Sequence, residues 1–150
     1  MKNYRELTSF CGIDCFNCDY FVDNITDESV AFLSKHMDID KEKVACKGCR
    51  IEEGCHMLFA ECKGCECVKE KGVDFCFECE EFPCEGFQPV AADADKYSHN
   101  MKLYNSCRIQ KIGLERWAKE EAKTIREKYF KGKYIVGRGV ILNGNGKKPE

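Results

Sequence analysis

Apolar side chains recur at helical spacing in three stretches of the chain. In the first, residues 27–37, Val30, Leu33 and Met37 stand three or four positions apart, which is typical of the buried face of a helix. Thr26 precedes them, and threonine caps helix N-termini by accepting a backbone hydrogen bond. The pattern predicts a helix over residues 27–37, with Thr26 as its cap and the three apolar residues buried.

Two more helical stretches follow residue 90. Tyr97, Met101 and Tyr104 share one face of a helix predicted from about residue 93 to residue 111. A second amphipathic helix is predicted over residues 114–130 because six apolar residues line one of its faces. This stripe consists of Leu114, Trp117, Ala118, Ala122, Ile125 and Tyr129.

The end of the chain contains short apolar runs and a polar tail. Residues 134–136 and 140–142 predict two short strand segments around a glycine-containing turn. Residues 143–150 are mainly Asn, Gly and Lys, which predicts a disordered tail. The predicted parts are residues 1–89, a two-helix extension over 90–133, and the strands and tail over 134–150.

Cysteine changes the meaning of the apolar count. Apolar residues make up 43% of the sequence, but 13 of them are cysteines, and 12 of these fall between Cys11 and Cys84. Eight form Cys-x-x-Cys pairs, whose spacing lets a tight turn direct two thiolates at one tetrahedral ion. The pairs are Cys15/Cys18, Cys46/Cys49, Cys62/Cys65 and Cys76/Cys79, and the remaining cysteines are Cys11, Cys55, Cys67 and Cys84. We therefore predict a small irregular metal-stabilised domain, mainly helical with short strands, followed by a helical C-terminal extension.

Zinc is the metal that this pattern favours. A site of four thiolates leaves no open coordination position, which is typical of structural zinc. Twelve cysteines suffice for three such sites, and His56, next to Cys55, is an alternative ligand that we expect to lie beside a site or at the surface, because adjacent residues seldom both reach one ion. Iron–sulfur clusters also use cysteine ligands, and the spacing of Cys11, Cys15 and Cys18 matches the cluster loop of radical enzymes that use S-adenosylmethionine. Those enzymes need a barrel of about 200 residues or more, so iron–sulfur stays the alternative.

Two of the pairs are the same tetrapeptide. Residues 46–49 and 62–65 both read Cys-Lys-Gly-Cys, which predicts two equivalent knuckles. Glycine at positive φ would let backbone N–H groups point at a metal-bound sulfur. No phosphate-binding loop, zinc-protease motif or nucleophile elbow occurs, so no catalytic or organic cofactor site is predicted and an enzyme is not expected.

The use of cysteine also bears on location. A disulfide framework needs an oxidising compartment. The first ten residues contain no apolar run of signal-peptide length, and no stretch approaches the roughly 20 apolar residues of a membrane span. An odd cysteine count would leave one thiol unpaired. We therefore expect reduced cysteines in a cytoplasmic protein without a membrane partner, with Cys107 as a small buried side chain on its helix.

Charge divides the chain into two halves. Residues 1–95 hold 10 Lys and Arg against 21 Asp and Glu, a net charge of −11, whereas residues 96–150 hold 14 against 5, a net charge of +9. Opposite charge favours packing of the basic helices on the acidic half. The basic run over residues 119–133 is also an alternative contact for nucleic acid, but its glutamates weaken the field. A protein is the expected partner, and the oligomeric state stays open.

The cysteine segments taken together resemble one known family. The segments are CGIDCFNC, CKGC before residue 50, the Cys62/Cys67 spacing, and EKGVDFCFECEEFPC. They resemble a widespread, functionally uncharacterised family of small cysteine-rich proteins in bacteria and archaea that are presumed to bind zinc. The resemblance covers about half of the chain and implies no activity or substrate. The family's cysteines correspond to Cys11, Cys15, Cys18, Cys46, Cys49, Cys62, Cys67, Cys76, Cys79 and Cys84. Cys55 and Cys65 are additions, so we expect two to three zinc ions.

Overall fold

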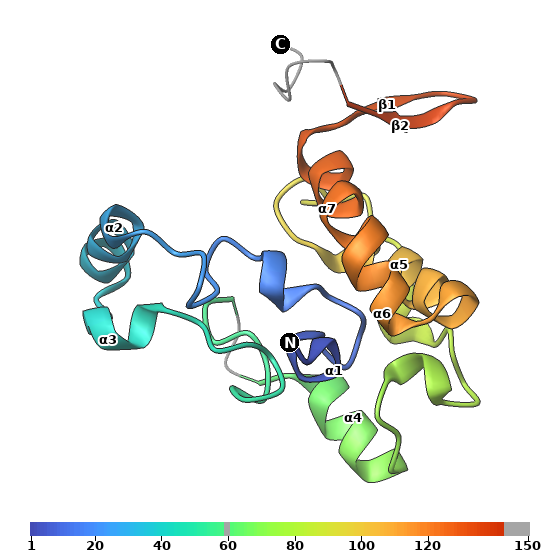
Figure 1. The fold of residues 1–150 in the computed structure, drawn as a ribbon, viewed down its shortest axis with the longest axis horizontal. Helices are drawn as coiled ribbons and strands as arrows, with labels where there is room; N and C mark the ends of the chain where they lie inside the picture. Colours follow the sequence, from blue (N-terminus) through green and yellow to red (C-terminus); the bar gives the residue numbers. More distant parts are fainter. Residues whose placement is uncertain (59–60, 143–150) are drawn as a thin grey trace.

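The computed structural model describes residues 1–58 and 61–142 of the chain (Figure 1). They form a small, irregular, mainly helical structure with one two-stranded sheet, which agrees with the predicted fold class. The helices are α1 (Tyr4–Leu7), α2 (Asp27–Met37), α3 (Lys41–Val44), α4 (Lys63–Lys71), α5 (His99–Ile112), α6 (Leu114–Arg116) and α7 (Ala122–Lys131), and the strands are β1 (Lys133–Ile135) and β2 (Gly139–Ile141). The tail predicted over residues 143–150 lies outside the described residues. No helix in the described ranges is long and apolar enough to cross a membrane.

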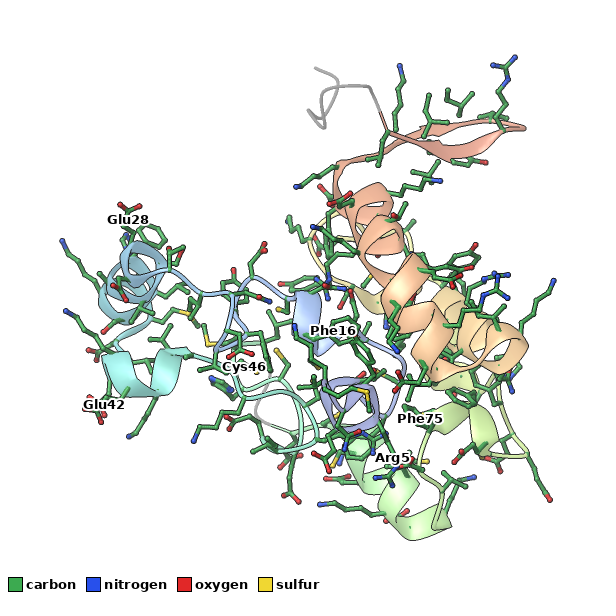
Figure 2. All side chains as sticks on the ribbon, in the orientation of Figure 1. Arg5, Phe16, Glu28, Glu42, Cys46 and Phe75 are labelled. Atoms are coloured by element: carbon green, nitrogen blue, oxygen red, sulfur yellow. The ribbon has the colours of Figure 1, made fainter. Side chains whose placement is uncertain are left out.

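Helices α2 and α3 form a lobe at one end of the molecule (Figure 1). As predicted, Thr26 caps α2, because its Oγ1 accepts the N–H of Ser29 at 3.2 Å. The predicted buried stripe is wrong, since no residue of α2 is buried and Met37 is 42% exposed. The physical reason is that α2 packs against the single turn of α3, which is too short to cover it. Glu28 on α2 and Glu42 on α3 point outward in Figure 2.

The main apolar core lies where the C-terminal helices meet the N-terminal segment. Trp117 is fully buried in a turn of π-helix, Trp117–Glu121, between α6 and α7. It contacts the ring of Phe16 edge to face, with 6.2 Å between centroids. The stripe predicted for this helix is confirmed, since Ala118 and Ala122 are also buried. The core further contains Ile109, with Tyr4, Leu7, Phe77, Ile112, Leu114 and Ile125 at its margin.

Helix α5 differs from its prediction in its start and in its buried face. It begins at His99, because Asp93 has a φ of 54° and its carbonyl accepts the N–H of Lys96 in a separate turn before the helix. Met101 is buried as predicted, but Tyr104 is 57% exposed, and the fully buried Asn105 lies on the inner face. Cys107, which was expected to be buried, is also exposed. The sequence pattern failed here because α5 buries polar residues against the backbone of a cysteine loop.

The two predicted strand segments are present and pair as an antiparallel hairpin. Tyr134 pairs with Val140, and the hairpin projects from the end of α7 (Figure 1). Gly132 joins helix and strand at a point where a side chain would collide with Lys128 and Val140. The absence of a Cβ at this position is therefore what lets the strand leave the helix so closely.

Candidate metal site

All twelve cysteines between Cys11 and Cys84 line one cavity of about 1230 Å³. Helices α5 and α7 supply much of the opposite wall. Cys107, in contrast, is exposed on α5 and is not among the lining residues. None of the cysteines is in a disulfide bond. In residues 1–58 and 61–142, no three His, Cys, Asp or Glu side chains converge closely enough to hold one ion.

The first Cys-x-x-Cys pair is built as a tight turn. Cys15 opens a single turn of 3-10 helix, Cys15–Asn17, and its carbonyl accepts the N–H of Cys18 at 3.0 Å. The backbone of Tyr20 then donates a hydrogen bond to the sulfur of Cys18. Such N–H to sulfur bonds orient and stabilise thiolate ligands in metal sites.

The second pair lies beside the first. The N–H of Cys46 donates to the carbonyl of Tyr20, and the N–H of Val22 donates to the carbonyl of Cys46, both at 2.8 Å. Gly48 has a φ of 102°, and its N–H donates to Cys46 Sγ at 3.3 Å. The role predicted for this glycine is confirmed. A backbone bridge therefore joins two cysteine pairs that are about 30 residues apart.

The third pair does not repeat the second, so the predicted equivalence of the two Cys-Lys-Gly-Cys segments is wrong. Cys62 is the N-cap of α4, and its sulfur accepts the N–H of Cys65 at 3.4 Å. Gly64 lies inside this helix, and the helix continues to Gly72, which takes the left-handed conformation at its end. The residues after each tetrapeptide decide its conformation, because a helix follows only in the second case.

The fourth pair lies next to Cys11. Cys76 opens a second 3-10 turn, and its N–H donates to the carbonyl of Phe10 at 2.9 Å. The carboxylate of Glu78 closes the start of this turn by accepting the N–H of Phe75 at 3.0 Å. The N–H of Glu81 donates to Cys79 Sγ at 3.4 Å. Donation from the second residue after a cysteine thus recurs at Cys18, Cys46, Cys55 and Cys79.

Electrostatic coupling defines a first thiol group around the two bridged pairs. The Cys15 and Cys49 thiols share a hydrogen bond, which lowers the pKa of Cys15 and raises the pKa of Cys49. Burial, reinforced by neighbouring thiols, raises the pKa of Cys46 to about 11. The first thiol group consists of Cys15, Cys18, Cys46, Cys49 and Cys55.

A second thiol group surrounds Cys76, the first cysteine of the fourth pair. Burial raises the pKa of Cys76 to about 12, and the charges of neighbouring thiols act in the same direction. Burial also raises the pKa of Cys11. The second thiol group consists of Cys11, Cys67, Cys76 and Cys84, and Cys11 also interacts electrostatically with Cys15 and Cys49 of the first group and with Cys62. Cys62, Cys65 and Cys79 line the same cavity outside these two groups.

The donor set fits a thiolate-bound metal in its chemistry. Thiols whose pKa is raised by burial hold their protons at neutral pH, so the cavity collects soft donors that a divalent cation deprotonates on binding. The knuckle hydrogen bonds are already formed at Cys46 and Cys79. The sulfurs would have to move inward to share an ion. His56 is exposed and lies outside the cavity, with its Nε2 at 3.0 Å from the carbonyl of Lys43.

Charged residues around the cysteines form contacts that the sequence pattern did not predict. Arg50, directly after Cys49, donates to the carbonyl of Thr8 at 2.8 Å and to the carboxylate of Asp74 at 2.8 Å. Its guanidinium also lies 4.6 Å from the ring centroids of both Phe10 and Phe75. Arg50 therefore ties the second pair to the segments that precede Cys11 and Cys76. Its position beside a cysteine was the signal that could have revealed it.

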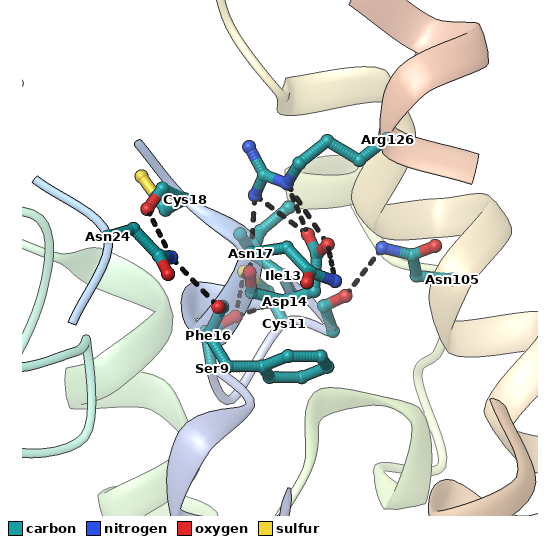
Figure 3. A network of polar contacts seen from close by, with 11 residues as sticks. Ser9, Cys11, Ile13, Asp14, Phe16, Asn17, Cys18, Asn24, Asn105 and Arg126 are labelled. Carbon is teal, nitrogen blue, oxygen red and sulfur yellow. Dashed lines mark hydrogen bonds and ion pairs between the residues drawn. The ribbon is translucent and has the colours of Figure 1, made fainter. Parts of the chain in front are cut away.

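A second charged network joins the first cysteine loop to helices α5 and α7 (Figure 3). Asp14 is fully buried and accepts hydrogen bonds from Arg126 on α7 and from Asn17. Asn105 on α5 donates to the carbonyl of Gly12 at 2.8 Å. An aspartate between two cysteines hints at such a network, but nothing in the sequence connects it to an arginine 112 residues away.

Similarity to known proteins is confined to the cysteine-rich part. A family model described as "Protein of unknown function (DUF3795)" matches residues 7–89, which include the twelve cavity cysteines. No curated protein and no solved structure matches the chain. Helices α5 to α7 and the hairpin lie beyond the matched residues.

Proposed function

Because this chain belongs to the DUF3795 family of proteins of unknown function, we propose a function from its own residues: it is a zinc-binding protein. The zinc sites are structural and are formed by cysteine thiolates from the cavity between Cys11 and Cys84. They support an accessory module that binds another protein. The family match supports a cysteine-rich protein of this kind and adds no activity.

The single observation that carries this proposal is the common cavity of the twelve cysteines. Cysteines from separate loops face one space, while Cys107, the one outside the family match, does not. The first and second thiol groups would each hold one ion, and the remaining three cysteines are candidates for a third. Bound zinc would supply a crosslink between loops that have little apolar core of their own.

The exposed face of α2 supports a role in protein binding. Tyr20, Glu28, Phe32 and Leu33 line a groove of about 350 Å³ on this lobe, and Phe32 is 59% exposed. Aromatic side chains in such grooves are common at protein interfaces. A lobe held in place by metal and bearing an apolar groove suits an accessory module better than an enzyme.

Metal analysis of protein purified under nitrogen tests the proposal. We expect a colourless preparation with two to three equivalents of zinc, by elemental analysis. A brown preparation that contains iron and sulfide would replace zinc by the iron–sulfur alternative. Protein that folds fully with no metal would overturn the proposal altogether.

Serine variants test which cysteines hold the metal. Cys46→Ser and Cys76→Ser each remove one thiol from one thiol group, so each is expected to lose about one equivalent of zinc or to fail to fold. Cys107→Ser is the matched control, because this cysteine is exposed and lies outside the cavity lining. Equal zinc content in all three variants would show that the cavity cysteines are not ligands.

A further inference from the structure

Two helices outside the family match each present a cation to one thiol group. We propose that α5 and α7 complete the metal site, with Arg126 and Lys102 as positioning residues that compensate the charge of the metal–thiolate groups. This inference rests on the proposed function. It assigns a role to the basic C-terminal half, which the zinc proposal itself leaves unexplained.

Arg126 binds the first cysteine loop through Asp14 (Figure 3). Its Nε lies 3.0 Å from both carboxylate oxygens of Asp14, and its Nη2 lies 2.7 Å from Oδ1. Asp14 is fully buried, and the Arg126 side chain is 17% exposed. Asn17 Nδ2 donates to the same carboxylate at 2.9 Å. Since Asp14 immediately precedes Cys15, the contact with Arg126 fixes the position of the first cysteine pair.

Helix α5 binds the same loop at the residues just before Asp14. Asn105 donates to the carbonyl of Gly12, and Ser106 Oγ donates to the carbonyl of Cys11 at 3.2 Å. Gly12 has a φ of 87°, and a Cβ there would lie 2.8 Å from Ser106 Oγ. The backbone of the loop therefore sits directly against the helix. This contact leaves no space for a larger residue and explains why α5 buries polar side chains.

Lys102 on α5 lies in the same cavity as the second thiol group, and within the described residues it has no carboxylate partner such as the one Arg126 has. Its ammonium group lies 4.9 Å from the ring centroid of Phe87, and its side chain lines the thiol cavity. Its positive charge acts on the thiols of Cys11 and Cys76, as that of Arg126 acts on Cys15 and Cys18. Each thiol group thus interacts with a cation from a C-terminal helix, and Lys123 and Lys131 of α7 also line the cavity.

Charge explains why such cations are needed. A zinc ion with four thiolates carries a net charge of −2, and part-buried charge is costly unless opposite charge lies close by. The first 95 residues already carry a net charge of −11, and the last 55 carry +9. Arg126 and Lys102 are the points where this long-range complementarity becomes local contact. We therefore expect their loss to weaken metal binding specifically.

The test compares two arginines of the C-terminal helices, Arg126 on α7 and Arg108 on α5, each of which pairs with a carboxylate. Arg126→Met removes the contact to Asp14, whereas Arg108→Met breaks the part-buried pair of Arg108 with Glu121, which does not touch the cysteines. Zinc affinity is measured by competition with a coloured chelator, and the ligand geometry by the absorption of the cobalt-loaded protein. Arg126→Met is expected to weaken one ion by about tenfold or more and to alter the cobalt spectrum. Arg108→Met is expected to lower the melting temperature alone.

Further variants keep the inference testable if Arg126→Met does not fold. Arg126→Lys retains the charge and is expected to restore part of the affinity. Lys102→Met is expected to weaken the second thiol group, with the exposed Lys111→Met as its control. Equal affinities in each variant and its control would overturn this inference while zinc binding by the unaltered chain still stands. An unaltered chain that binds neither zinc nor cobalt would instead overturn the proposed function.

Discussion

Helix α2, in the cysteine-rich region of residues 1–89, buries none of its 11 residues, whereas Trp117, in the C-terminal region of residues 90–142, is fully enclosed. The contrast extends to the surroundings. Val44 and Phe21 are buried beside Cys46, but the main apolar core lies on α5 and α7. The C-terminal region is ordered by apolar packing, and the cysteine-rich region is organised around thiols.

One chain can therefore combine two sources of stability, apolar packing and metal bound by thiolates. Burial of a large apolar side chain contributes about 1.5 to 3 kcal/mol, so apolar packing stabilises the C-terminal core. The cysteine loops have irregular backbone and bury scattered apolar side chains such as Phe21, Met57 and Phe75, and a cation shared by several thiolates would add a crosslink between them. Phe16, directly after Cys15, belongs to both because it packs on Trp117.

Removal of metal is expected to have the largest effect, and this effect should be confined mainly to the cysteine-rich region. A strong chelator should abolish amide protection over residues 11–84 while much of the helical signal of α5 and α7 persists, because structural zinc contributes about 10 kcal/mol or more. Hydrogen exchange with mass spectrometry measures both regions in one sample. The control is the same chelator saturated with zinc. Unchanged protection in the cysteine loops would mean that they do not depend on metal.

Substitution of Trp117 by Ala is the second largest perturbation and affects the other region. Loss of this side chain leaves a cavity in the core, and the expected cost is about 3–5 kcal/mol in chemical denaturation. Zinc content per folded molecule should stay unchanged. Tyr134→Ala is the control, since that ring is 67% exposed and its loss should cost less than about 0.5 kcal/mol. A Trp117→Ala protein without zinc would show that the two regions cannot be separated.

The sequence predicted the second region better than the first, for a physical reason. The stripe of Trp117, Ala118 and Ala122 was correct because apolar packing has a helical period that can be read along the chain. The strand segments around the glycine-containing turn and the Thr26 cap of α2 were correct because caps and glycines act locally. The periodic rule failed on α2 and α5. It cannot tell whether another element covers a helix, or whether a buried Asn serves a distant backbone.

Around the cysteines, spacing predicted the local turns but not their assembly. The knuckle at Gly48 followed from the tetrapeptide, yet the same letters at residues 62–65 start a helix. The contacts of Asp14 with Arg126 and of Arg50 with Asp74 span 112 and 24 residues. Such pairs depend on the tertiary structure, and no local pattern encodes them. Whether each cysteine binds metal stays a prediction.

A change of pH is expected to have a smaller effect, and it acts on the thiols of the cysteine-rich region. Burial raises the pKa of Cys46 to about 11 and that of Cys76 to about 12, from an ordinary value of 9.0. Both thiols are therefore protonated at pH 7 in the metal-free protein, and zinc must displace their protons. Affinity should rise with pH between about 6 and 9, by up to tenfold per unit for each proton released. A pH indicator in weak buffer measures the release, and loading without any release would contradict thiol ligation.

The smallest expected effect comes from the cap of α2, and it tests whether the exposed lobe is independent of both regions. Thr26→Ala removes the hydrogen bond from Ser29 and should destabilise α2 by about 1 kcal/mol. Because α2 buries no residue, this loss should appear as faster amide exchange within Asp27–Met37, with no change in zinc content or in the global denaturation midpoint. Thr26→Ser, which keeps the hydroxyl, is the control. A fall in the global midpoint would show that α2 is coupled to the thiol groups, since the chain passes from α3 directly to Cys46.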